Sequence, residues 1–181
     1  MTKKELQEIE EKARDYGLKD FKSMNPKTIP IRQWVRNKCI FGCWRYGCWG
    51  TCPPELPSIP ECARFFQEYR GGLFIHFAEK LKDPEMRHAW SRKAQKNLVA
   101  LEREVFLSGY YKAFVFPPAT CCLCDACKGP KKACRHPHEA RPNLEGFGVD
   151  VYATAWKMGY PVQVLKGYKE EMNRFALLLV E

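Results

Sequence analysis

Ten cysteines lie in two short stretches of this chain of 181 residues, five from Cys39 to Cys62 and five from Cys121 to Cys134. The chain opens with Met-Thr-Lys-Lys-Glu-Leu, and no apolar stretch follows these basic residues, so the sequence predicts no secretory signal. Without export the cysteines stay reduced, and clustered reduced cysteines indicate metal ligands in preference to disulfides. The first expectation is therefore a cytoplasmic metal-binding protein.

The second stretch has the more specific spacing. Cys121, Cys124 and Cys127 form C-x2-C-x2-C, and Cys134 follows after six further residues. Three thiolates at this spacing can each reach a different iron of a cuboidal cluster, and the bacterial ferredoxin run begins in the same way. Zinc is usually bound by separated C-x2-C pairs. The spacing favours a [4Fe–4S] cluster on these four cysteines, with zinc as the alternative.

The first stretch matches no ferredoxin spacing. Its candidate ligands are Cys39, Cys43, Cys48 and Cys52, the last of which is followed by two prolines. Four thiolates so close in sequence can hold one metal centre, and both a second cluster and zinc remain open. In ferredoxins a cysteine before proline often completes a distant cluster, so Cys52 is also an alternative to Cys134 at the second site. We expect each stretch to close its own site.

Two arginines flank the end of the second stretch. We expect Arg135 and Arg141 to donate hydrogen bonds to thiolate or sulfide sulfur, which raises the reduction potential of a cluster. The alternative is that they pair with Glu139 and Glu145. Four further candidates in the stretches are expected not to be ligands, namely His136, His138, Cys62 and Cys122.

Outside the cysteine stretches, apolar periodicity predicts an α/β fold, with α+β as the alternative. Helices are expected at 3–15, within an N-terminal helical segment of residues 1–20, and at 61–69, 83–108 and 149–158. Strands are expected at 73–78, 113–116, 162–165 and 175–180. Residues 22–38 and the cysteine loops, 39–62 and 121–148, are rich in turn-forming residues and are expected to be irregular.

The helix at 83–108 is the longest predicted element. Asp83 and Pro84 mark its start. Its buried stripe is expected to comprise Met86, Trp90, Ala94, Leu98, Leu101 and Val105. Because a long crossover allows the two flanking strands to be parallel, we expect a mixed sheet of about four strands. The whole chain, residues 1–181, is expected to form a single domain.

The two stretches together resemble a known family of predicted metal-binding proteins, a domain of unknown function common in anaerobic archaea and bacteria. Its first signature is similar to Cys39-x3-Cys43-x2-Tyr46-Gly47-x4-Cys52-Pro53-Pro54. Its second is similar to Cys121-x2-Cys124-x2-Cys127-x6-Cys134-Arg135-x-Pro137, followed by Arg141-Pro142-x2-Glu145-x2-Gly148-x-Asp150-Val151. The resemblance covers about residues 30–180 and implies a cysteine-bound metal, iron–sulfur in kind, and an anaerobic host. It carries ligand roles over to Cys39, Cys43, Cys52, Cys121, Cys124, Cys127 and Cys134, whereas position 48 is not a fixed cysteine in the family pattern.

Motifs for other chemistry are missing from the sequence. The chain contains neither G-x-G-x-x-G nor G-x-x-x-x-G-K-[ST], and no paired carboxylates or Ser-His-Asp arrangement can be assigned. We therefore expect an electron carrier or redox subunit more readily than a stand-alone enzyme. One alternative is a reductase whose cluster keeps an open coordination position at an iron.

The formal net charge of +9 favours acidic partners. An acidic redox partner is expected on the basic residues of the second loop, which are Lys128, Lys131, Lys132 and Arg135. The other alternative is a zinc-stapled module that binds nucleic acid, with Trp44, Tyr46 and Trp49 stacked on bases beside Arg45. In an iron–sulfur protein the same aromatic side chains would shield a cluster from water. The longest apolar run, residues 175–180, is too short to span a membrane.

Overall fold

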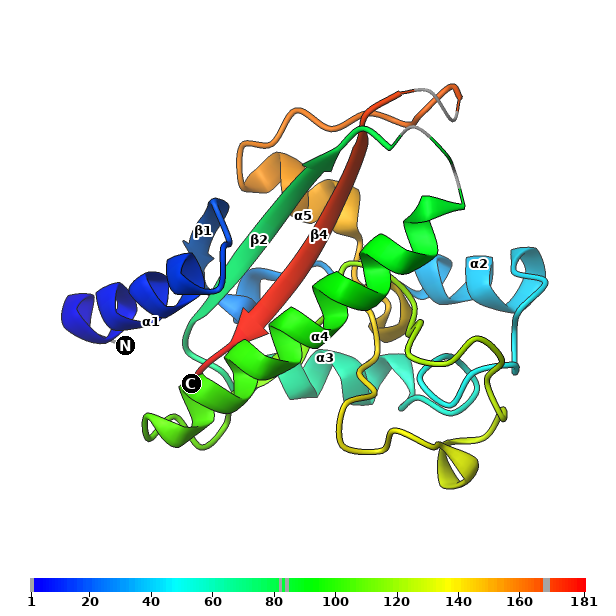
Figure 1. The fold of residues 1–181 in the computed structure, drawn as a ribbon, viewed down its shortest axis with the longest axis horizontal. Coiled ribbons are helices and arrows are strands. Elements are labelled where there is room, and N and C mark those ends of the chain that lie inside the picture. The colour runs from blue at the N-terminus through cyan, green and yellow to red at the C-terminus, as the bar shows by residue number, and fades with distance from the viewer. Residues whose placement is uncertain (1, 82, 84, 168–169) are drawn as a thin grey trace.

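A four-stranded sheet runs through the middle of the computed structural model, which describes residues 2–81, 83, 85–167 and 170–181 (Figure 1). Its strands are β1 (Asp20–Met24), β2 (Gly72–Glu79), β3 (Phe114–Phe116) and β4 (Met172–Leu179), in the order β1-β2-β4-β3. The two central strands, β2 and β4, pair from Gly72 with Leu179 to Glu79 with Met172. The predicted α/β class with a four-stranded sheet is confirmed.

The strand pairings of the described residues are all antiparallel, so the sheet is not mixed as the sequence predicts. β2 and β3 do run in the same direction, as two strands joined by a long helix are able to do. They are not neighbours, because β4 lies between them and pairs with both. The C-terminal strand therefore turns a potential parallel contact into two antiparallel ones.

Side chains alternate along the central strands, and helices cover both faces of the sheet. Leu73 and Ile75 are buried on the face covered by α1 (Lys3–Asp15) and α4 (Met86–Leu107) (Figure 1). Phe74 and Phe175 stack with ring centres 4.8 Å apart on the other face, with α3 (Ile59–Gln67) and α5 (Val151–Lys157). The fold has an apolar core on each side of the sheet.

The predicted helix start is confirmed for α1, but for α4 it is two residues too early, because the N-cap is Glu85, without a side-chain cap bond. α1 begins with a reciprocal capping box between Thr2 and Glu5. Directly before α4, the Asp83 carboxylate accepts a hydrogen bond from the backbone N–H of Glu85 (2.9 Å), whereas Pro84 lies outside the described residues. Among the helices that the structure describes, none is long and apolar enough to cross a membrane.

The predicted buried stripe of α4 is correct only in the second half of the helix. Leu98, Leu101 and Val105 are buried as expected, but in the first half the buried residues are Ser91 and Gln95. The first half of α4 contacts the second cysteine loop as well as the sheet, where Trp90 packs edge-on against Phe77 of β2. Polar side chains there have partners in that loop, as described below.

Two elements lie in a segment for which the sequence predicts irregular structure. β1 begins at residue 20, and α2 (Gln33–Gly42) follows a short 3-10 turn, η1 (Pro26–Thr28). α2 has no side-chain cap and buries only Val35 and Arg36, so its apolar periodicity is weak. The strand expected at 162–165 is wrong, because this segment forms no strand and only Val162 within it is buried.

The two cysteine stretches lie side by side beyond α2 and α3 (Figure 1). Trp49 and Gly129 form a backbone bridge between them, and Glu55 accepts a hydrogen bond from the backbone N–H of Lys131 (3.1 Å). A β-carbon at Gly50 would lie 2.7 Å from the Cα of Lys131, so only glycine fits at this contact. The second cysteine loop, 121–148, includes the 3-10 turns η2 (Lys131–Ala133) and η3 (Glu145–Phe147). The two loops therefore form one structural unit.

Candidate metal centre

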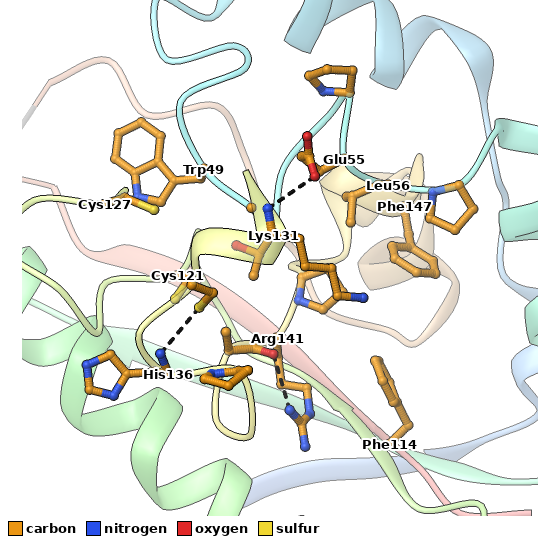
Figure 2. A pocket seen from close by; sticks show the side chains of 18 of the residues that line it. Trp49, Glu55, Leu56, Phe114, Cys121, Cys127, Lys131, His136, Arg141 and Phe147 are labelled. Atoms are coloured by element: carbon orange, nitrogen blue, oxygen red, sulfur yellow. Dashed lines mark hydrogen bonds between the residues drawn. The ribbon is translucent and has the colours of Figure 1, made fainter. Parts of the chain in front are cut away.

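A cavity of about 990 Å³ lies between the two cysteine loops (Figure 2). The four candidate ligands of the second stretch all line it, namely Cys121, Cys124, Cys127 and Cys134. The first loop contributes Trp49 and Thr51 to the opposite wall. The side-chain oxygen of Thr51 is buried and has no hydrogen-bond partner among the described residues. The structure thus gathers these four thiols around one hollow.

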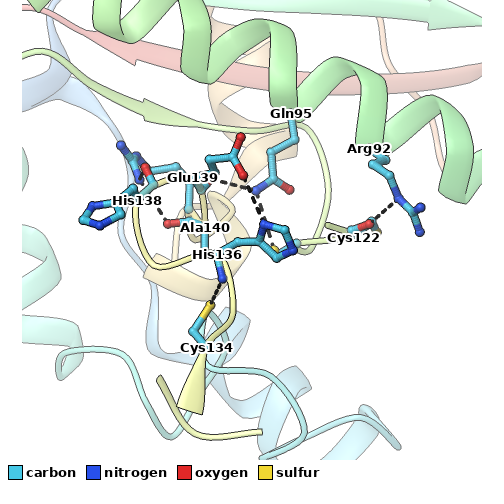
Figure 3. Close-up of polar contacts among 10 residues, drawn as sticks. Arg92, Gln95, Cys122, Cys134, His136, His138, Glu139 and Ala140 are labelled. Atoms are coloured by element: carbon cyan, nitrogen blue, oxygen red, sulfur yellow. Dashed lines mark hydrogen bonds and ion pairs between the residues drawn. The ribbon is translucent and has the colours of Figure 1, made fainter. Parts of the chain in front are cut away.

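Two of these sulfur atoms accept hydrogen bonds from N–H groups (Figure 3). The side-chain amide of Gln95 donates to Cys121 Sγ (3.6 Å) and to the backbone oxygen of Glu139 (3.1 Å), and Gln95 is only 1% exposed. The backbone N–H of His136 donates to Cys134 Sγ (3.4 Å), while its ring lies 3.1 Å from the Glu139 carboxylate. Such donors stabilise negative charge on sulfur. The structure places His136 beside the candidate ligands, in contact with Cys134 through its backbone.

Gln95 is a contact that the sequence does not reveal. It occupies a position on α4 that faces the second loop, one residue from the predicted apolar stripe. The signal for it is burial, which the sequence alone does not give. A glutamine that is fully buried in a helix must find hydrogen-bond partners for its amide. Here the amide does so by connecting a thiol to the loop backbone on which the other ligands lie.

Burial and neighbouring thiols both raise the pKa of Cys121. Burial has the largest effect, the thiols of Cys134 and Cys127 add to it, and the Gln95 hydrogen bond opposes it. Cys121 is therefore close enough to Cys127 and Cys134 for their charges to affect its pKa. Cys124 lines the same cavity and acts electrostatically on the guanidinium of Arg92.

Three cysteines of the first stretch also approach one another. Burial, followed by the charges of Cys39 and Cys43, raises the pKa of Cys52 to about 12. Burial and Cys43 raise the pKa of Cys39, while the Arg36 guanidinium opposes this. Cys48 is exposed, and its thiol donates to the backbone oxygen of Tyr46 (3.7 Å). The charges of Cys39 and Cys43 thus act on Cys52, whereas Cys48 is not among these causes; Cys43 and Cys48 are both exposed.

The two groups of thiols adjoin at Cys52. Among the charges that raise the pKa of Cys52 is the thiolate of Cys121, from the second group. The backbone bridge between Trp49 and Gly129 also holds the two loops in contact. The two candidate centres therefore lie near each other, although their ligands are far apart in sequence.

The two arginines of the second stretch contact the protein itself. Arg135 donates to the backbone oxygen of Ala126 (2.7 Å), within the loop. Arg141 forms a two-pronged ion pair with Glu102 of α4, with Nε to Oε2 at 3.0 Å, and also donates to loop carbonyl groups. Glu102 in turn accepts from the backbone N–H of Val115 in β3 (2.7 Å). Neither arginine forms an ion pair with Glu139 or Glu145 within the described residues, and Arg141 anchors the loop to the sheet layer.

Cys62 and Cys122 have other surroundings. Cys62 is fully buried on α3, where its thiol donates to the Pro57 carbonyl (3.5 Å) and lies 3.9 Å from the Arg36 guanidinium. Cys122 is half-buried, and its thiol donates to the backbone oxygen of Thr120 (3.0 Å).

The aromatic residues of the first loop divide into two environments. Trp44 is 82% exposed, whereas Trp49 is half-buried and lines the cavity. The guanidinium of Arg45 lies over both rings, 4.4 Å and 4.8 Å from their centres. Of the two, only Trp49 is placed to shield the cavity from water.

A comparison with protein-family models matches residues 22–180 to the family described as "Predicted metal-binding protein (DUF2284)". No curated protein and no solved structure gives a significant match. The matched range includes both cysteine stretches, the sheet from residue 22 of β1 onward, and the described helices after α1. The chain therefore belongs to this family of predicted metal-binding proteins.

Proposed function

We propose that the protein is a cytoplasmic iron–sulfur protein that transfers electrons. A [4Fe–4S] cluster would be held by Cys121, Cys124, Cys127 and Cys134, and a second metal centre by the first group. The supporting observation is the cavity between the loops, where all four thiols of the second group line one hollow.

The spacing of the cysteines in the sequence supports a cluster over a single zinc ion. Three thiolates in C-x2-C-x2-C can each bind a different iron of a cuboidal cluster. Zinc is usually bound by separated C-x2-C pairs instead.

The surroundings of the sulfurs support a redox role. A [4Fe–4S] cluster takes up and releases a single electron at a potential that hydrogen bonds to its sulfurs adjust. The Gln95 amide and the His136 backbone N–H are placed to stabilise the extra negative charge of the reduced state. One donor lies on a long helix, and the other lies at a turn in which the His136 ring contacts Glu139. These donors would raise the potential of the second centre.

A second candidate function is supported by the first group. Cys39, Cys43 and Cys52 affect one another electrostatically there, whereas the exposed Cys48 is not among the causes of their pKa shifts. A centre with three protein ligands keeps an open coordination position, as a reductase requires. Cys48 completes the set only if its loop turns inward.

The direct test is the metal content of protein purified without oxygen. We expect a brown sample with absorbance near ~400 nm, and ~4 to ~8 iron atoms per chain with matching acid-labile sulfide. A colourless sample with stoichiometric zinc and no sulfide would overturn the proposal. Retention of single-stranded nucleic acid by such a sample, with a steep dependence on salt, would instead favour a zinc-stapled binding module.

We further propose an acidic redox partner that docks on the second loop. Lys128, Lys131, Lys132 and Arg135 all have exposed side chains on the loop that carries the ligands. A partner bound there would lie close to the cluster, and opposite charge speeds encounter. Lys131→Glu/Lys132→Glu is expected to slow electron transfer to partners from the same cells and to reduce its salt dependence. Unchanged rates and salt slope, with iron content intact, would contradict the docking site.

A further inference from the structure

A second cavity, of about 390 Å³, lies on the other side of the first cysteine group. It is lined by α2, by the start of α5, by the segment 162–165 and by the beginning of β4. β3 pairs only with residues 177–179 of β4, so the first part of that edge has no strand beside it in the described chain. The cavity lies where the short β3 leaves the sheet uncovered. Its volume is in the range of small-molecule sites.

The walls combine apolar surface with charged groups. Trp34, Val162 and Phe175 supply apolar or aromatic surface. The charged residues on the walls are Lys38, Arg87, Arg174, Glu145 and Asp150. A site with a largely apolar body and a few polar groups is typical of pockets for small organic molecules.

The two acidic residues already accept hydrogen bonds within the protein. Glu145 Oε2 accepts from the Asn143 amide (2.8 Å), and Asp150 Oδ1 accepts from the Ala153 backbone N–H (3.0 Å), which caps α5. These bonds use part of the capacity of both carboxylates. They also fix the two side chains on the wall of the cavity.

The cations on the wall have fewer partners. Arg174 forms no hydrogen bond or ion pair with any residue that the structure describes, although its charge reaches Glu145 and Cys122. The ammonium group of Lys38 lies over the ring of Trp34, 5.1 Å from its centre. A half-buried guanidinium without hydrogen bonds has a fork of donors free for a carboxylate. Arg174 therefore offers free hydrogen-bond donors on a wall that carries three cations and two carboxylates.

The cavity also reaches the first thiol group. Cys39, which approaches Cys43 and Cys52, forms part of its wall. A molecule in the cavity would lie with one side against this group and another against Arg174. The larger cavity has no cysteine of the first group on its wall, because the cysteines that line it all belong to the second group.

We propose that this cavity binds a small organic carboxylate with an apolar or aromatic body, held by Arg174 and Lys38 beside Cys39. The carboxylate would take the free donors of Arg174, and the body would pack against Trp34 and Phe175. This inference goes beyond electron transfer and does not depend on which metal the first group holds.

The test is ligand-observed NMR with the anaerobic metal-loaded protein. The probes are benzoate, phenylacetate and hexanoate, each compared with its neutral amide of the same shape. We expect the carboxylates to bind more tightly than the amides, and Arg174→Gln to weaken their binding by about tenfold or more. Lys38→Gln should weaken it less, because this ammonium group is more exposed.

Arg103→Gln is the matched control, since it removes the same charge from an exposed position on α4 outside the cavity. It should bind the carboxylates as the wild type does. Iron and zinc contents are measured for every variant, so a lost metal centre is not mistaken for a lost binding site. Equal binding of acids and amides, or equal affinity of the Arg174 and Arg103 variants, would overturn the proposal. A failure of electron transfer alone would leave it standing.

Discussion

The ion pair between Arg141 and Glu102 gives a quantitative test of how the second cysteine loop is held. The Arg141–Glu102 pair joins the end of this loop to α4 and, through the carboxylate that also accepts from the Val115 N–H, to β3. Both side chains are largely buried, with 17% and 11% of their surface exposed. Arg141→Met keeps much of the apolar stem and removes the charge.

The cost follows from what remains behind. Removing one partner of a buried ion pair leaves the other charge uncompensated, which costs about 3–5 kcal/mol. The Val115 hydrogen bond to Glu102 stays in place and keeps the loss toward the lower end of that range. In the double variant Arg141→Met/Glu102→Gln, the neutral amide still accepts from Val115, so about 1–2 kcal/mol of the loss should be recovered.

Urea unfolding of the anaerobic protein, followed by far-UV circular dichroism, measures these differences. With a slope of about 3 kcal/mol per molar urea, the midpoint for Arg141→Met should fall by about 1–2 M. Arg103→Met, an exposed arginine of the same α4, should change the free energy of unfolding by less than about 0.5 kcal/mol. If Arg141→Met and Arg103→Met have the same midpoint of urea unfolding, the ion pair does not hold the loop, and the reasoning fails.

Two further predictions concern the thiols. Cys124→Ser should lose about four iron atoms per chain while Cys122→Ser keeps the wild-type content, and equal loss in iron and sulfide analysis would show that the ligand assignment is wrong. Gln95→Leu should lower the reduction potential in a redox titration by about 60 mV. This shift corresponds to a bond to Cys121 that is about 1.4 kcal/mol stronger in the reduced state. The control is Gln7→Leu at an exposed position, which should leave the potential unchanged.

Local signals in the sequence predicted the regular elements that have strong ones. The capping box at Thr2 and Glu5 marked α1. Apolar runs marked β2 and β4, and only the run of β2 is interrupted, by His76. The direction of pairing was not accessible, because periodicity tells which face of a strand is buried but not which strand lies beside it. The C-terminal position of β4 in the chain gave no sign that it would insert between β2 and β3.

The elements that escaped prediction bury little. α2 has only Val35 and Arg36 in the interior. Nη2 of Arg36 donates to the carbonyl groups of Pro57 and Gly146, which are distant in sequence, while its buried Nε has no partner among the described residues. The segment 162–165 also buries little. Its residue pattern is typical of a strand, but only Val162 is buried. A pattern of residue types predicts structure where the tertiary surroundings agree with it, and these two segments depend on surroundings that the pattern does not contain.

The candidate site shows the same division between what lies in the cysteine pattern and what the fold supplies. The spacing of Cys121, Cys124 and Cys127 is a property of the loop alone and was readable. The donor from Gln95 depends on the register of α4 against the loop, because a rotation by one position would bring Ala94 toward the thiols. A donor to a ligand that comes from a separate helix is therefore visible only in three dimensions.

The close contact of the two loops bears on how the metal centres would be loaded. Binding of metal to one cysteine group orders the loop that carries it. Because Gly50 and Lys131 touch through their backbones, ordering one loop fixes a wall of the other. Cys52 and Cys121 are also near enough to affect each other electrostatically, so the charge of one centre is felt at the second. The two cysteine groups, though separate in sequence, are on this argument coupled both in their folding and in their charge.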